Sequence, residues 1–347
     1  MTTSSSAASL TRTSSLSTAI PIAKLIEPVK ANLTLVEELL VTNLIDDNPF
    51  VSELLNQIFQ AGGKRLRPAL VLLCSHATLK SQQEFSRLHI ILAVLTELIH
   101  TASLVHDDVI DKASLRRGQG TLNHRFNDRI AVLMGDLLFA QASICLARIM
   151  NPVVVGIYGQ VLGDLCAGEL SQMKQQYIAC VNWQDYIRKS VAKTASLFAA
   201  GSHSGAILNS ASNDTIAALK NYGLKLGIAF QIIDDLLDFT GTSNELGKEP
   251  GGDLRSGIIT APALFVLEQQ SAASKRLSHL ITTRAVLHDE GTQEALELIK
   301  SNGGIDATVA LAQKYGEESK NSLACLPASP YCDSLVLLVD YVLTRVT

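Results

Sequence analysis

Long stretches with helical hydrophobic periodicity run through this chain from Pro21 onward. Apolar residues recur three and four positions apart in "LIEPVKANLTLVEELLVTNLI", "DRIAVLMGDLLFAQASICLARIM" and "VVGIYGQVLGDLCAGELSQMKQQYI", which is the spacing of one helix face. Gly and Pro fall mostly between these stretches, and Asn182 and Asn213 stand before apolar runs as expected N-caps. No convincing series of alternating strands is present, so the sequence predicts an all-α chain with a single domain over residues 21–347.

One stretch, "HIILAVLTELIHTASLVHDDVID", is apolar on more than one face. A helix that is apolar nearly all round lies in the centre of a bundle rather than on its surface. Because 47% of the 347 residues are hydrophobic, the chain also has the side chains for a large core. We therefore expect a large helical bundle, with the aspartates of this stretch at the end of a buried helix.

Two aspartate clusters share one spacing, in "VHDDVID" and in "FQIIDDLLDF". They consist of Asp107, Asp108 and Asp111, and of Asp234, Asp235 and Asp238. Residues four apart lie about 40° apart around a helix axis, so each cluster projects two carboxylates to one side. Two such pairs facing across a bundle suit hard divalent cations, with Mg²⁺ the usual ion and Mn²⁺ the other candidate. The alternative is two independent, solvated helix ends.

Basic residues accompany both clusters, mostly in glycine-punctuated turns. They are Lys64, Arg65, Arg67, Arg116, Arg117, Lys193 and Lys248. Arginine forks and lysine point charges suit phosphate oxygens, although each residue alone is more often a solvated surface charge. Their joint occurrence predicts two anionic groups, one bound through metal and one bound by side chains alone.

The overall charge and the apolar runs limit the kinds of partner. The formal net charge is −4, so no global basic field is available to bind nucleic acid. The runs "PALVLLC" and "HIILAVL" are interrupted by polar residues, which predicts a soluble chain without a transmembrane helix. Six scattered cysteines lack the close spacing of zinc sites and are expected to be buried free thiols.

The first twenty residues are rich in Ser and Thr and contain no acidic residue. This composition fits either a disordered tail, which we favour for residues 1–20, or a short organelle transit segment.

Five segments together resemble one enzyme family, the trans-isoprenyl diphosphate synthases. They are, in order, "GGKRLRP", "HTASLVHDDVIDKASLRRG", "AVLMGDLLFAQA", "KTASL" and "GIAFQIIDDLLDFTGTSNELGKEPGGDLRSGIITAP". The likeness runs from about residue 22 to the end of the sequence. Among subgroups the chain is most similar to the long-chain, solanesyl-type polyprenyl diphosphate synthases of cyanobacteria and plastids.

This resemblance implies a fold, an activity and partners. The fold is the isoprenoid synthase bundle around a central cavity. The activity is Mg²⁺-dependent addition of isopentenyl diphosphate to an allylic diphosphate by ionisation, condensation and elimination, with a long product for quinone side chains such as plastoquinone. A homodimer in the cytoplasm or plastid stroma is expected, with peripheral membrane contact for product release.

The resemblance also implies a role for each residue of the matching motifs. Asp107, Asp111 and Asp234 would ligate Mg²⁺ ions on the allylic diphosphate, with Asp108, Asp235 and Asp238 in supporting positions. Arg116, Lys193 and Lys248 would hold the same diphosphate. Lys64, Arg67, His100 and Arg117 would bind isopentenyl diphosphate without metal, and Thr194 and Gln231 would place oxygen dipoles beside the forming cation. Glu97 and Glu169, in apolar surroundings, are expected to be buried partners of arginines.

The sequence departs from the family pattern at Ile258, where many relatives have a lysine after the glycine that Gly257 matches. Either Arg255 substitutes in closing the site, which we favour, or the diphosphate is held less firmly.

Product length is read from the residues before Asp107. In this family a bulky residue four or five positions upstream closes the product channel of short-chain enzymes. Here those positions are Ser103 and Ala102, with Ile99 one turn further down, so no floor is expected at that level. A helical turn rises about 5.4 Å, close to one extended isoprene unit, which predicts a product longer than about twenty carbons. Core packing is the other interpretation of Ile99.

Other functions remain as alternatives. A geranylgeranyl or other shorter-chain synthase would share every motif. A noncatalytic subunit of the same fold would be expected to lack one aspartate cluster. A Mg²⁺-dependent diphosphate hydrolase or terpene cyclase would have no use for the second anion site around "GGKRLRP".

Overall fold

The computed structural model describes residues 20–42, 48–60, 62–116, 118–180, 182–241 and 250–346. Within these ranges the chain is almost entirely helical, and the two-residue strands β1 (Leu115–Arg116) and β2 (Gln119–Gly120) form one antiparallel pair. The all-α prediction is therefore confirmed. The predicted tail, apart from Ile20, lies outside the described residues.

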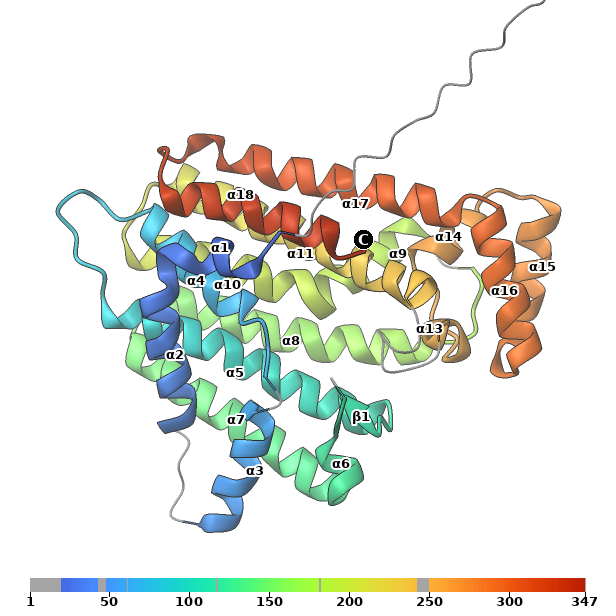
Figure 1. Cartoon of the computed structure of the whole chain (residues 1–347), viewed down its shortest axis with the longest axis horizontal. Coiled ribbons are helices and arrows are strands. Elements are labelled where there is room, and N and C mark those ends of the chain that lie inside the picture. Colours follow the sequence, from blue (N-terminus) through green and yellow to red (C-terminus); the bar gives the residue numbers. More distant parts are fainter. Residues whose placement is uncertain are drawn as a thin grey trace, which may run out of the picture.

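Four helices form the centre of the bundle (Figure 1). They are α4 (Leu66–Ala77), α5 (Arg87–Ile110), α10 (Ser196–Leu208) and α11 (Asn213–Thr240). The helix α10 contacts the other three, and its residues 196–206 are all buried. This arrangement confirms that the aspartates of α5 end a buried helix.

Further long helices pack around this centre. Along one side, α7 (Asp128–Ile149) contacts α5, and α8 (Pro152–Lys174) contacts α10. On the opposite side α17 (Gly304–Asn321) packs on α11, and α18 (Pro330–Leu343) packs on α4 and α17. Figure 1 shows α17 and α18 along one edge of the bundle and α7 toward the other.

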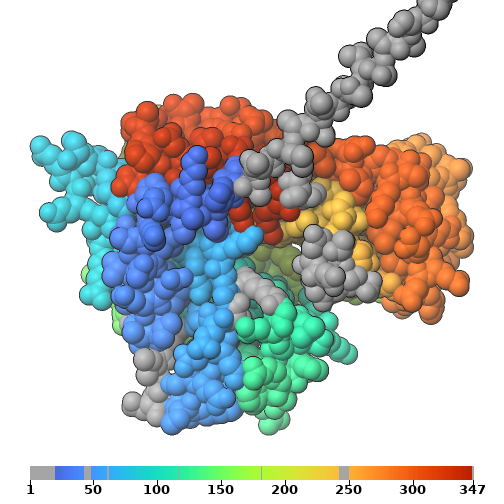
Figure 2. All heavy atoms as spheres, in the orientation of Figure 1, coloured from blue at the N-terminus to red at the C-terminus, as the bar shows by residue number. Residues whose placement is uncertain are grey.

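Shorter elements connect and flank these helices. Before the bundle centre come α1 (Ile22–Ile26), η1 (Glu27–Val29), α2 (Lys30–Thr42) and α3 (Pro49–Gln60), and later α6 (Leu122–Arg125), α9 (Trp183–Ser190) and the π-turn η2 (Val191–Ala195). The remainder are α13 (Gly252–Arg255), α14 (Ala261–Leu267), α15 (Ala272–Thr282), η3 (Ala285–Leu287), α16 (Asp289–Ser301), η4 (Ser322–Cys325) and η5 (Thr344–Val346). Figure 2 shows α3, in light blue, beside the α6 segment, in green. The Phe50 and Phe126 rings meet edge to face.

Two glycines allow the central helices to approach closely. A Cβ atom on Gly205 of α10 would lie 2.1 Å from the Ser75 hydroxyl of α4, and one on Gly227 of α11 would lie 2.5 Å from the Ala195 Cα. Neither position has room for a side chain. The contact at Gly227 therefore brings η2 directly against α11.

One of the two expected N-caps is confirmed. The Asn182 side chain accepts a hydrogen bond from the Asp185 backbone N–H at the start of α9. At α11 the prediction is wrong by one residue, because Ser212 caps the helix through the Thr215 N–H and Asn213 is already helical.

Of two predictions drawn from apolar patterns, the burial of every cysteine is wrong and the absence of a transmembrane helix stays a prediction. In the described part of the chain α5, α7 and α8 are each long and apolar enough to cross a membrane by length and composition alone. The most apolar window of α5 is 67% buried inside the protein, against 33% for α7 and 22% for α8. The cysteines are all free, but only Cys74 and Cys145 are buried; Cys166, Cys180 and Cys325 are exposed and Cys332 is half-buried.

Candidate active site

The first aspartate cluster lies at the end of α5, where Asp111 is the C-cap residue. Asp108 is buried, and its Oδ1 accepts hydrogen bonds from Nε and Nη2 of Arg116 at 2.7 and 2.6 Å. The Asn123 side chain of α6 donates to the Asp108 carbonyl at 3.1 Å, which ties the segment after α5 back onto the helix. Arg116 thus pairs with a carboxylate of the cluster, and Asp107 and Asp111 are its two cation-binding candidates.

In the second cluster, on α11, Asp235 and Asp238 have neutral hydrogen-bond donors. Asp235 accepts the Tyr186 hydroxyl at 2.7 Å and the Gln231 side-chain N–H at 2.8 Å. Asp238 accepts the Asp253 backbone N–H at 3.0 Å, so the α13 segment is held on the end of α11. Both side chains are buried and positioned, in agreement with a supporting role.

Asp234 is the most exposed carboxylate of the second cluster, with 37% of its side chain accessible. Its Oδ1 lies 3.1 Å from Nη2 of Arg345 in η5. Loss of surrounding water raises the pKa of Asp234 to about 6, although the Arg345 and Arg67 charges act in the opposite direction. A bound cation would therefore stabilise the ionised form of Asp234.

The π-turn η2 carries two predicted site residues. Its Val191 carbonyl accepts the Ser196 N–H, five residues on, and such turns occur often at functional sites. The Thr194 hydroxyl donates to Oε1 of Gln231 at 2.5 Å. Because Gln231 also bonds Asp235, a chain of hydrogen bonds connects η2 with the second cluster.

Lys193 of η2 interacts by charge with the first cluster and with Asp253 of α13. Its Nζ lies 3.5 Å from Oε2 of Glu169 on α8. Burial acts to lower the pKa of Lys193, but Asp107, Glu169, Asp111 and Asp253 together raise it above the ordinary value. Desolvation raises the pKa of Asp107 to about 6, with Lys193 opposing and Glu169 and Asp111 adding to the increase. One ammonium therefore faces the Asp107–Asp111 pair and the segment held on Asp238.

A second basic group gathers at the start of α4. Arg67 Nη1 lies 3.1 Å from the His100 Nε2 of α5, and its guanidinium lies 4.7 Å from the Phe198 ring centre and 5.6 Å from that of Phe230. Lys64 is exposed just before this helix. The structure thus brings Arg67 and His100 together, while the Lys64 ammonium lies 5.2 Å from the centre of the Tyr341 ring. Arg117 and Lys248 lie outside the described residues.

A hollow that is open to solvent lies against the face of α5 that ends at Asp108. His100, Leu104, Asp108 and Arg116 line it, together with Ile58 of α3. Leu104 gives it an apolar surface between His100 and Asp108, whereas much of the remaining lining is polar.

The two glutamates predicted to be buried differ in exposure and in partner, because Glu97 is buried and Glu169 is half-buried. Glu97 Oε1 accepts from Arg65 Nη1 at 2.9 Å, which confirms an arginine partner. Glu169 pairs with Lys193 instead, so the arginine predicted there is wrong. Its place on α8 brings it to the site.

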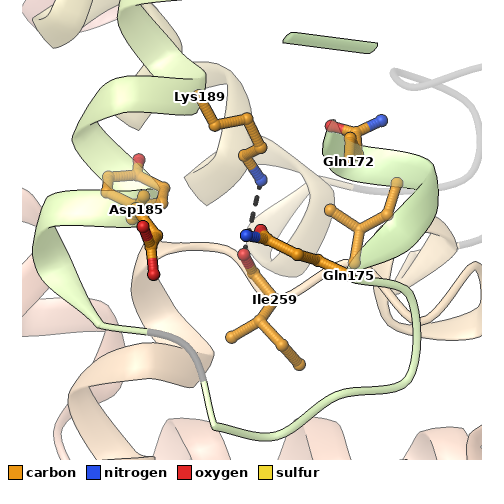
Figure 3. Close-up of a pocket in the computed structure, with 7 residues that line it drawn as sticks. Gln172, Gln175, Asp185, Lys189 and Ile259 are labelled. Carbon is orange, nitrogen blue, oxygen red and sulfur yellow. Dashed lines mark hydrogen bonds between the residues drawn. The ribbon is translucent and has the colours of Figure 1, made fainter. Parts of the chain in front are cut away.

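Ile258, where the family lysine is missing, lines a small hollow beside the second cluster (Figure 3). Lys189 points into this hollow and donates to the Ile259 carbonyl at 3.4 Å (Figure 3). Arg255 instead lies 2.8 Å from Asp289. The cation beside Ile258 is thus Lys189, and the expected substitution by Arg255 finds no support in these contacts.

The expected product-length residues differ in environment. Ala102 and Ile99 are fully buried, whereas Ser103 is half-buried with its hydroxyl donating to the His100 carbonyl at 2.8 Å. Further down α5, the Thr96 hydroxyl lies 2.6 Å from the hydroxyl of Tyr158 on α8, and both residues are buried. No bulky residue of α5 itself stands at Ser103 or Ala102.

Comparison with known proteins agrees with this geometry. The polyprenyl synthetase family matches residues 48–299. A prenyl transferase of Synechocystis sp. is 42% identical over 94% of this chain and 99% of its own length. The chloroplastic solanesyl diphosphate synthase 1 of Arabidopsis thaliana is 39% identical over 94% of this chain and 80% of its own length.

Solved structures give the same result. The crystal structure of a polyprenyl synthase from Caulobacter crescentus CB15, complexed with calcium and isoprenyl diphosphate, has a TM-score of 0.88 and 31% identity, covering 95% of this chain and 99% of that one. A decaprenyl diphosphate synthase from Rhodobacter capsulatus has a TM-score of 0.87 and 32% identity, covering 94% and 100%. The family resemblance found in the motifs is confirmed, and the chain belongs to the polyprenyl synthetase family of prenyltransferases.

Proposed function

We propose that this prenyltransferase is an all-trans-polyprenyl diphosphate synthase that adds isopentenyl diphosphate to a growing allylic diphosphate. One observation carries the proposal: the described part of the chain holds two separate sets of charges. Lys193 with the Asp107–Asp111 pair at the end of α5 forms the first set, and Arg67 with His100 forms the second. Two diphosphates, one bound with metal and one without, need such a division.

The residues present fit a hard divalent ion, for which we propose Mg²⁺, with Mn²⁺ as the other candidate. In the described part of the chain no group of three or more His, Cys, Asp or Glu side chains is close enough to hold a metal ion alone. Mg²⁺ is commonly held by one or two carboxylates, with water and substrate phosphate completing its shell. Asp107, Asp111 and Asp234 would supply those carboxylates. The raised pKa of Asp107 and of Asp234, each about 6, marks carboxylates that an added cation would stabilise.

The chemistry follows from the placement of these groups. Cleavage of the allylic C–O bond leaves a carbocation and a diphosphate anion, and bound metal supplies positive charge to that anion. Lys193 holds the leaving diphosphate, and the hydroxyl and amide oxygens of Thr194 and Gln231 face the cation. The isopentenyl double bond forms the new C–C bond, and a diphosphate oxygen takes the proton that is lost. Apolar side chains of α5, such as Leu104, would help to keep water from capturing the cation.

We also propose a long-chain, solanesyl-type product for quinone side chains, made in the cytoplasm or the plastid stroma. Similarity to the Arabidopsis enzyme and the small side chains at Ala102 and Ser103, with Ile99 one turn below, support this assignment. A shorter product, such as geranylgeranyl diphosphate, is the alternative.

A homodimer would account for the exposed apolar residues of α7 and α8. They are Val132, Leu133, Ile144, Val153, Val155, Leu170 and Met173. Sedimentation of the purified protein tests this arrangement. Contact of the same helices with membrane lipid during product release is the competing use of these residues.

The double variant Lys64→Gln/Arg67→Gln tests the proposed reaction with labelled isopentenyl diphosphate and farnesyl diphosphate. We expect condensation to be lost while metal-dependent binding of the allylic diphosphate remains. The exposed Lys24→Gln variant is the control for loss of a surface charge. Unchanged condensation by the double variant, or hydrolysis of the allylic diphosphate as the main wild-type reaction, would contradict the proposal.

A further inference from the structure

Arg345 forms an ion pair with Asp234, the most exposed carboxylate of the second aspartate cluster. Its Nη2 lies 3.1 Å from Asp234 Oδ1, and its guanidinium carbon lies 4.5 Å from the centre of the Phe230 ring. The other terminal nitrogen, Nη1, is buried and has no hydrogen-bond partner among the described residues. The guanidinium is thus held at the site with one of its donors unused, although buried donors are normally satisfied.

Arg345 also stands beside the second basic group. The Arg67 guanidinium lies 5.6 Å from the centre of the same Phe230 ring, and the Lys64 ammonium lies 5.2 Å from the ring centre of Tyr341 on α18. The Tyr341 hydroxyl is buried and likewise lacks a hydrogen-bond partner in the described part of the chain. Two guanidiniums therefore meet at Phe230, and a third cation lies over Tyr341, four residues before Arg345. With the two unused donors, these groups are suited to an anion with several oxygens.

A divalent ion on Asp234 weakens the hold of this carboxylate on Arg345. A Mg²⁺ ion approaches a carboxylate oxygen to about 2.0–2.1 Å, takes up part of the carboxylate charge and repels a guanidinium nearby. Binding of metal at Asp234 therefore favours transfer of Arg345 to another acceptor. The long arginine side chain can turn to an acceptor nearby, and its planar fork suits a diphosphate.

We propose that Arg345 is an exchangeable positioning residue. It neutralises Asp234 before metal binds, and it passes to the metal-free diphosphate of isopentenyl diphosphate when a divalent ion takes Asp234. The inference rests on the proposed function and adds a link between its two anion sites. Occupancy of the metal site then strengthens isopentenyl diphosphate binding, and by linkage the reverse also holds.

Calorimetric titration of the full-length protein with isopentenyl diphosphate tests the exchange without relying on turnover. Each variant is titrated once in EDTA and once with Mg²⁺ and farnesyl thiolodiphosphate, an allylic analogue that ionises very slowly. For the wild type we expect affinity to rise at least about tenfold in the second condition, the value of one charge-assisted hydrogen bond. Arg345→Gln should abolish most of this rise.

The variant Asp234→Asn gives the sharper result, because it releases Arg345 without any metal. We expect its affinity for isopentenyl diphosphate in EDTA to exceed that of the wild type about tenfold, and the double variant Asp234→Asn/Arg345→Gln to lose that gain. Lys320→Gln is the matched control, because it removes a cation 2.7 Å from Asp340 and so loosens α18 without touching the site. Its two affinities should equal those of the wild type.

Two results would overturn the exchange while leaving the proposed function intact. One is that metal and the allylic analogue raise the affinity for isopentenyl diphosphate equally in the wild type and in Arg345→Gln. The other is that Asp234→Asn binds isopentenyl diphosphate in EDTA no more tightly than the wild type does. If no variant, wild type included, binds isopentenyl diphosphate in either condition, the proposed function itself fails, and the exchange fails with it.

Discussion

The substitution Ser103→Phe tests whether the face of α5 below Asp107 forms the product channel. Ser103 precedes Asp107 by four residues, which corresponds to about 6 Å along the helix axis, or roughly one isoprene unit. The serine is half-buried and its hydroxyl bonds only the His100 carbonyl among the described residues, so a larger side chain has space that the fully buried Ala102 lacks. The phenyl ring should therefore cross the channel one unit below the carboxylates and stop elongation at about fifteen to twenty carbons.

The assay is the chain-length distribution formed from farnesyl diphosphate and labelled isopentenyl diphosphate, separated by reversed-phase chromatography after removal of the diphosphate. Ser143→Phe, on the exposed face of α7, is the control for adding a ring, because the Ser143 hydroxyl also bonds a carbonyl of its own helix, at 3.0 Å. Thermal unfolding shows whether either variant is destabilised. If Ser103→Phe remains folded and its longest product equals that of the wild type, the channel does not follow this face of α5.

Three further predictions concern packing, pH and the missing lysine. Gly205→Ala should lower the free energy of unfolding by about 1–3 kcal/mol in urea titrations, because its Cβ would lie 2.1 Å from a hydroxyl of α4. Gly163→Ala should not lower it, because no atom lies within 4 Å of the added Cβ. Burial lowers the pKa of His76 from 6.5 to about 4, so folding disfavours protonation of this histidine. The free energy of unfolding should therefore fall as the pH drops from 6.5 toward 4, and it should fall less in His76→Phe. Urea midpoints measured at pH 7 and pH 5 check this. Lys189→Gln should weaken binding of the allylic diphosphate about tenfold, whereas Arg255→Gln should leave this affinity unchanged. If calorimetry shows that Arg255→Gln loses affinity and Lys189→Gln does not, Arg255 has the role expected from the sequence.

The parts of the site that could be predicted are those that helix periodicity places on one face. The spacing of Asp107 and Asp111, and of Asp234 and Asp238, already fixes which carboxylates share a side of a helix. The apolar character of the stretch before Asp107 likewise predicts its burial, which the structure confirms.

What could not be predicted are the pairings between segments far apart in the chain. Nothing near Asp234 in the sequence indicates Arg345, and nothing near Asp235 indicates Tyr186, because packing alone brings them within hydrogen-bond distance. The pairing of Arg116 with Asp108 depends on a short β turn that periodicity does not detect.

Residue type alone predicts more burial of cysteines than the structure has. A cysteine in a mostly apolar helix was expected to be buried, but Cys166 lies on the outward face of α8. Val155, Leu170 and Met173 of the same helix are likewise exposed in the part of the chain that the structure describes. Composition alone does not distinguish a helix in the core from one that presents apolar side chains to solvent or to a partner.

Because of the π-turn η2, the positions of Lys193 and Thr194 depend on the number of residues between α9 and α10. A π turn accommodates one residue more than an α turn, so removal of a single residue there would let α9 and α10 join as one regular helix. That helix would be locally more favourable, but the residues before the deletion would rotate by about 100° relative to α10. Lys193 and Thr194 would then no longer face Asp107 and Gln231 together. An engineer seeking a more stable variant can exchange side chains around this turn, but shortening it would displace two residues of the proposed site.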